Sequence, residues 1–71
     1  MAAATLHKGT RKAEVDVEEL AGGKFQGVVM VFHEGGEASE QIQRRTADVF
    51  DTMEGALAEA RVLAHHILGD L

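Results

Sequence analysis

Apolar and acidic residues alternate in the first third of the chain, which is the pattern of a strand with one buried face. The odd-numbered positions are apolar (Ala13, Val15 and Val17), and the even-numbered positions are acidic (Glu14, Asp16 and Glu18). Successive side chains of a β-strand point to opposite faces of its sheet. The alternation therefore predicts a half-buried antiparallel strand over residues 11–19.

A second predicted strand, residues 24–33, is apolar at most positions. Gly22 and Gly23 separate it from the first strand, and paired glycines favour two-residue hairpin turns because glycine accepts positive φ angles. With such a turn, three apolar pairs fall on one face of the sheet. The predicted pairs are Val17 with Val28, Val15 with Met30, and Ala13 with Phe32.

The other face of this second strand carries another apolar row, which contains Phe25, Val29 and Val31. A strand that is apolar on both faces is typical of a central strand covered on both sides. One helix covers only one side of a sheet, so we expect the chain to form a homodimer through this second row or through a strand edge. The predicted binding residues are Phe25, Val29, Val31 and Ile42.

The third predicted strand, residues 39–49, does not keep a strict period of two. Ile42 and Phe50, which directly follows the strand, are at even-numbered positions, whereas Ala47 and Val49 are at odd-numbered positions. In a regular strand the two sets would point to opposite faces. A bulge near Arg44 and Arg45 would reconcile the two sets. A tight turn at Gly35–Gly36 would place Val29 opposite Ile42, whereas a longer loop would change that pairing.

The C-terminal third has an apolar residue every three or four positions, which is the period of one face of an α-helix. We expect the helix to begin near Asp51 or Thr52. Asp51 and Glu54 fit a capping box, and Thr52 is also suited to cap the first turn. The apolar stripe consists of Met53, Ala56, Leu57, Ala60, Leu63, Ala64, Ile67 and Leu71.

These elements predict an α+β fold: a three-stranded antiparallel sheet, built as a β-hairpin and a further strand, with one C-terminal helix packed on one face. Residues 1–71 form a single domain, in which residues 1–9 are either disordered or a short edge strand. Three Phe, no Trp and no Cys give so short a chain little core, which favours association. The expected core joins sheet and helix residues: Val15, Val17, Val28, Met30 and Phe32 with Met53, Leu57, Ala60, Leu63, Ala64 and Ile67.

Composition narrows the classes of function. The net charge of −5 disfavours a dedicated nucleic-acid binder, which normally carries a basic surface. No apolar stretch approaches the roughly 18 residues of a membrane span, and the first residues lack the apolar region of a signal peptide. Together with the absence of Cys, this predicts a cytoplasmic protein.

Four histidines raise the question of a metal site. His65 and His66 are adjacent, so on a helix their side chains diverge by about 100° and do not share one ion. The acidic residues follow a solvated strand face and loops, where paired carboxylates lack the desolvated cleft that separates their pKa values. We assign no catalytic residue, cofactor or metal, and enzymatic activity is not expected. A site that joins His33 with His65 or His66 at a subunit interface stays open.

Four basic residues define an alternative function. Arg11, Lys12, Arg44 and Arg45 lie on strands that could bring them together to contact nucleic acid. The order of three strands and a helix resembles part of the double-stranded-RNA-binding domain. That family carries a further N-terminal helix and a lysine-rich helix start, whereas Asp51 and Glu54 would here repel phosphate.

The run GVVMVF at residues 27–32, followed by residues 44–68, is similar to small bacterial βββα proteins of unassigned function. The resemblance spans most of the chain and implies a fold without site residues. The sequence therefore predicts a non-catalytic homodimeric binding or assembly module of unknown ligand. RNA binding through the four basic residues, and an enzyme or metal site at a subunit interface, are the alternatives.

Overall fold

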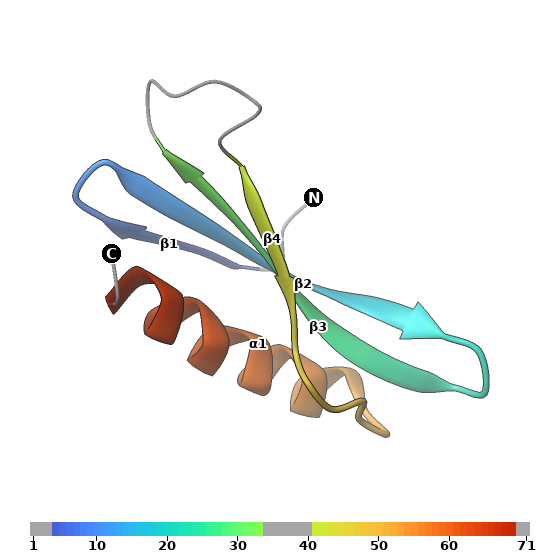
Figure 1. Ribbon diagram of the computed structural model, residues 1–71. Coiled ribbons are helices and arrows are strands. Elements are labelled where there is room, and N and C mark those ends of the chain that lie inside the picture. The colour runs from blue at the N-terminus through green and yellow to red at the C-terminus, as the bar shows by residue number, and fades with distance from the viewer. Residues whose placement is uncertain (1–3, 34–40, 70–71) are drawn as a thin grey trace.

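The computed structural model describes residues 4–33 and 41–69. Four antiparallel strands form one sheet in chain order, and a single helix packs against one face (Figure 1). The predicted α+β class with a C-terminal helix is confirmed, whereas the prediction of three strands is corrected to four. The elements are β1 (Ala4–Lys8), β2 (Arg11–Leu20), β3 (Lys24–His33), β4 (Ile42–Arg45) and α1 (Met53–Gly69).

The additional strand is β1, which pairs with β2 through a two-residue turn at Gly9 and Thr10. Lys8 and Arg11 close the turn. Gly9 has a φ of 59°, and no other residue type takes a positive φ among the described residues. A positive φ at the first central position alone is the geometry of a type II′ hairpin, which requires glycine there. Residues 1–9 were expected to be either disordered or a short edge strand, and the edge strand is correct for β1.

The turn between β2 and β3 has three residues, 21–23, where the paired glycines predicted two. Gly22 and Gly23 both take positive φ, at 85° and 76°. The extra residue shifts the register by one, so that Val15 lies opposite Val29 and not opposite Met30. A shift of one residue moves every side chain of a strand to the other face. The predicted face of β3 is therefore wrong.

The core lies between α1 and the β2–β3 pair. Val15, Val29 and Val31 are its largest fully buried side chains. The predicted core members Val28, Met30 and Phe32 lie on the opposite face, and Met53 is 57% exposed. The buried apolar residues are Ala13, Val15, Val29, Val31, Ala56, Ala60, Ala64 and Leu68.

Gly27 lets the helix approach the sheet closely. A Cβ atom at this position would lie 2.7 Å from the Ala56 carbonyl oxygen and 2.7 Å from the Ala60 Cβ. Both distances are far below van der Waals contact, so a side chain does not fit without movement of the backbone. Alanines on α1 and a glycine on β3 thus set the spacing between the layers.

Thr46 anchors the segment that leads from β4 to the helix. Its hydroxyl accepts a hydrogen bond from the Gly27 amide at 3.1 Å and donates one to the Asp48 carbonyl oxygen at 2.8 Å. The pairing resumes four residues after Thr46, where Phe25 and Phe50 exchange backbone hydrogen bonds of 2.8 and 2.7 Å. The irregularity therefore occupies residues 47–49 and not the predicted bulge at Arg44–Arg45.

The start of α1 is capped by Thr52, whose hydroxyl accepts a hydrogen bond from the Gly55 amide at 3.0 Å. Asp51 does not take the predicted capping role. It pairs instead with Lys24, and the hydrogen bond and positive charge of that ammonium hold the pKa of Asp51 below its ordinary value. Ile42 lies opposite Val31 and not Val29, while Gly35–Gly36 falls outside the described residues.

Candidate interaction surface

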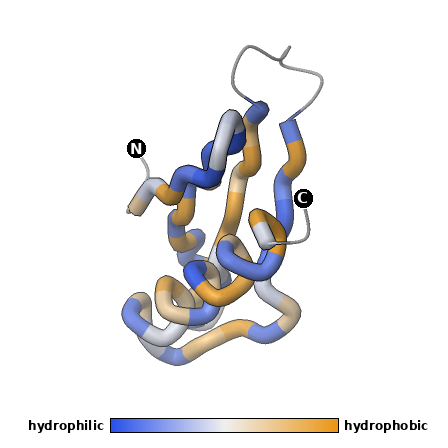
Figure 2. The backbone as a smooth tube through the Cα atoms, turned by 90° about the vertical axis from the view of Figure 1, so that its left-hand side faces the viewer, coloured by the Kyte–Doolittle hydropathy of each residue, from blue (hydrophilic) through white to orange (hydrophobic). Residues whose placement is uncertain are grey.

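The sheet has one face under α1 and one face that no described element covers (Figure 1). Because Val29 and Val31 point toward the helix, the even-numbered side chains of β3 point the other way. Val28, Met30 and Phe32 therefore form a central apolar row on the uncovered side, which we call the open face. All three are half-buried, and β3 is nearly continuously hydrophobic along this stretch (Figure 2).

Charged and polar side chains flank the central apolar row. On the β2 side lies an acidic row that consists of Glu14, Asp16 and Glu18. On the β4 side lie Gln43 and Arg45. Asp16, Val28 and Arg45 occupy the same level across the three strands, as the backbone pairing shows. The β2 side of the open face thus carries three carboxylates together with Lys12, and the β4 side carries Arg45.

Long side chains partly shield the apolar row. Arg45 reaches across β3 to form an ion pair with Glu18, although the two strands are not neighbours. At the other end, the Lys12 ammonium lies 5.1 Å from the centre of the Phe32 ring and 3.4 Å from a Glu14 carboxylate oxygen. Exposed pairs of this kind contribute only about 0–1 kcal/mol each. They cover apolar carbon without excluding a partner.

The residues predicted to form the interface lie elsewhere. Val29 is 0% exposed and Val31 is 2% exposed beneath the helix, so neither can contact a second chain. Phe25 pairs with Phe50 in the same layer, and Ile42 packs against the core. The expectation that these four side chains form the exposed row is wrong, because the three-residue turn exchanged the two faces of β3. The central apolar row takes that place.

The four basic residues proposed for nucleic-acid contact do not gather on one surface. Arg11 has the parity of Val15, and Arg44 lies opposite Val29, so both are on the helix side of the sheet. Lys12 and Arg45 are on the open face, with the acidic row extending between them. In each of the two neighbouring pairs, 11–12 and 44–45, one basic residue therefore lies on the helix side of the sheet and the other on the open face.

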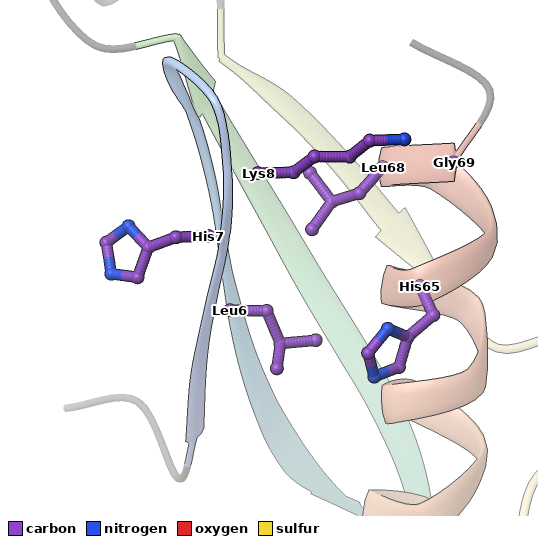
Figure 3. A pocket seen from close by; sticks show the side chains of 6 residues that line it. All are labelled: Leu6, His7, Lys8, His65, Leu68 and Gly69. Atoms are coloured by element: carbon purple, nitrogen blue, oxygen red, sulfur yellow. The ribbon is translucent and has the colours of Figure 1, made fainter.

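The histidines are also separated. His65 lines a hollow of about 260 Å³ between β1 and the end of α1, where it faces Leu6 while His7 points away (Figure 3). His66 lines a different hollow, of about 250 Å³, beside Thr46. His33 lies within 3.2 Å of the Thr10 hydroxyl at the hairpin end of the sheet. In the described part of the chain, no group of three or more His, Asp or Glu residues could hold a metal ion.

The two edges of the described sheet carry positive charge. Lys8 lies at the end of β1, and Arg44 and Arg45 lie at the end of β4. Charged side chains, lysine above all, are a common device against edge-to-edge pairing of sheets. Pairing of β1 with β4 of another molecule would bring like charges together. The open face carries no such uniform charge.

Comparison of the chain with protein-family models, with curated proteins and with solved structures finds no match. Among residues 4–33 and 41–69, no helix combines the length and the apolar character that a bilayer crossing demands.

Proposed function

We propose that this protein is a non-catalytic assembly module, and that a second copy of the chain covers the central apolar row of its open face. The observation that supports the proposal is the composition of β3, which is apolar on the face that α1 covers and again on the face that it leaves open. Contiguous apolar surface on an uncovered sheet face commonly marks an interface.

The chemistry of the surface favours a second copy over a nucleic acid. Phosphate would meet the acidic row, whose three carboxylates border the apolar side chains. Charge protects the edges, which favours association through the open face over edge-to-edge pairing. Dimerisation through the open face gives a small chain a larger hydrophobic core than it can build alone.

The test is a pair of matched double variants. Val28→Lys with Met30→Lys places two charges in the central apolar row, and we expect it to convert a dimer into a folded monomer. Val62→Lys with Met53→Lys makes the same two changes on α1, at residues that are 60% and 57% exposed, and is expected to leave the dimer intact. Sedimentation equilibrium reports the mass, and far-UV circular dichroism confirms that each variant is folded.

Either of two results contradicts the proposal. The first is a parent chain that stays monomeric at concentrations up to roughly a millimolar. The second is a folded open-face double variant with the same mass as the parent, because the apolar row would then not be the contact.

A further inference from the structure

We propose that the hollow between β1 and the last turns of α1 binds a small aliphatic carboxylate. The hollow has a volume of about 260 Å³ and is lined by Leu6, His7, Lys8, His65, Leu68 and Gly69. It lies on the helix side of the sheet, opposite the open face, so the proposal is independent of the assembly proposed above. A cationic end and an apolar interior give the hollow this preference.

The cationic end of the hollow is the hairpin that joins β1 and β2. Lys8 lies directly opposite Arg11, and both side chains have the helix-side parity of Leu6 and Ala13, which pack in the core. The Cβ atoms of such a pair are roughly 5 Å apart, and like charges directly opposite each other destabilise a strand pair. Neither cation has a side-chain hydrogen bond or ion pair within residues 4–33 and 41–69. An anion bound between them would relieve the repulsion.

Carboxylates of the described part of the chain lie away from these two cations. The acidic row occupies the opposite side of the sheet. Glu19 has helix-side parity but lies at the far end of β2, next to the 21–23 turn. The others precede α1 or lie in its first half, whereas the hollow borders its last turns: Asp48, Asp51, Glu54 and Glu59. In a chain of net charge −5, this end of the helix side is therefore a cationic exception.

The interior of the hollow is apolar (Figure 3). Leu6 from β1 and Leu68 from α1 point into it, and the His65 ring faces Leu6. Leu68 is only 4% exposed, so the core holds this part of the lining in place. An aliphatic chain would contact the two leucines and the face of the imidazole. Its carboxylate would lie at the hairpin end, where a guanidinium donates two parallel hydrogen bonds to such a group.

The dimensions of the hollow limit the length of the ligand. Its volume is below the roughly 300–1,000 Å³ of sites that hold drug-sized molecules. Leu6 and Lys8 are two residues apart in β1, a distance of roughly 7 Å that about five or six carbon atoms of an extended chain would span. The fitting ligand is therefore a carboxylic acid of about six carbons.

The C-terminal end of α1 competes with a ligand for one of the two cations. The Lys8 side chain extends from β1 toward Leu68 and Gly69 in the last turn (Figure 3). The carbonyl groups at a helix C-terminus are equivalent to roughly half a negative charge. This compensates at most part of the Lys8 charge and leaves Arg11 uncompensated. A carboxylate, which carries a full charge, has a net attraction to the pair.

Titration of the isotope-labelled chain with sodium hexanoate tests the site by NMR. We expect the amide resonances of the residues that line the hollow to shift to saturation, with a dissociation constant on the order of a millimolar. Lys8→Gln with Arg11→Gln is expected to weaken binding at least about fivefold. Arg44→Gln with Arg61→Gln removes the same charge elsewhere on the surface and is expected to bind hexanoate as the parent does.

Two further ligands separate the charge from the aliphatic chain. Hexanamide keeps the chain without the charge, and acetate keeps the charge without most of the chain. Each is expected to bind at least about fivefold more weakly than hexanoate. Equal binding of either one overturns the proposal, because one half of the site would then contribute nothing.

Two other results also overturn it. One is the absence of saturable shifts with hexanoate up to on the order of 50 mM. The other is a Lys8→Gln with Arg11→Gln variant that is folded by circular dichroism and binds as tightly as the parent. None of these outcomes depends on the mass of the chain in solution, so the site and the proposed assembly succeed or fail separately.

Discussion

The two faces of the sheet are built from the same strands but differ in how they are covered. Beneath α1, small and branched side chains pack without charge, and Gly27 brings the helix close. On the open face, three apolar side chains lie between charged neighbours that only partly cover them. Since β3 is apolar on both sides, its apolar pattern alone does not decide which row the helix covers. The length of one turn makes that decision.

The largest expected effect comes from the same substitution at two neighbouring positions of β3. Val29→Lys places a charge in the core and is expected to destabilise the fold by about 3–5 kcal/mol, enough to unfold so small a domain. Val28→Lys, on the open face, is expected to leave the monomer fold intact. Circular dichroism during urea denaturation measures both. Equal loss of stability in the two variants would contradict the assigned faces.

A smaller effect tests the spacing beneath α1. Gly27→Ala is expected to cost about 1–3 kcal/mol, because its Cβ would lie 2.7 Å from the Ala56 carbonyl oxygen and from the Ala60 Cβ. Gly69→Ala is the matched control, since a Cβ there has no atom within 4 Å. The control is expected to be neutral or slightly stabilising. A tolerated Gly27→Ala change would mean that the layers are not held at this distance.

The smallest effect concerns the ion pair of Lys24 and Asp51 at the end of the hairpin. Because the folded state lowers the pKa of Asp51, the pair stabilises the fold at pH values above the ordinary pKa of 3.8. This contribution is lost as pH falls through the lowered value. Asp51→Asn is therefore expected to reduce the thermal midpoint slightly at pH 7 and to match the parent in strong acid. A difference that is independent of pH would exclude the pair as its cause.

Much of the fold could be predicted from periodicity. Residues 24–33 coincide with β3, and the apolar stripe lies on α1 from Met53 to Ile67, while its last member, Leu71, falls outside the described residues. Periodicity does not decide whether residues 1–9 are disordered or an edge strand, although Gly9 supplies the glycine that the first position of a type II′ turn requires.

The existence of an uncovered apolar row could be predicted from the sequence, whereas the residues that form it could not. The sequence indicates that one apolar row of β3 stays uncovered, and the structure agrees. It does not determine the row, because Gly22 and Gly23 are compatible with turns of two or three residues. A sequence signal for the correct choice exists in Gly27, which has the parity of Val29 and matches the alanines of α1 in size.

The mass of the parent chain in solution tests the central claim most directly. The account predicts a species of twice the 7.6 kDa chain mass at micromolar to tens of micromolar concentration, measured by sedimentation equilibrium. A single 7.6 kDa species throughout that range and up to roughly a millimolar would contradict it, because the central apolar row would then be stable in water without a partner.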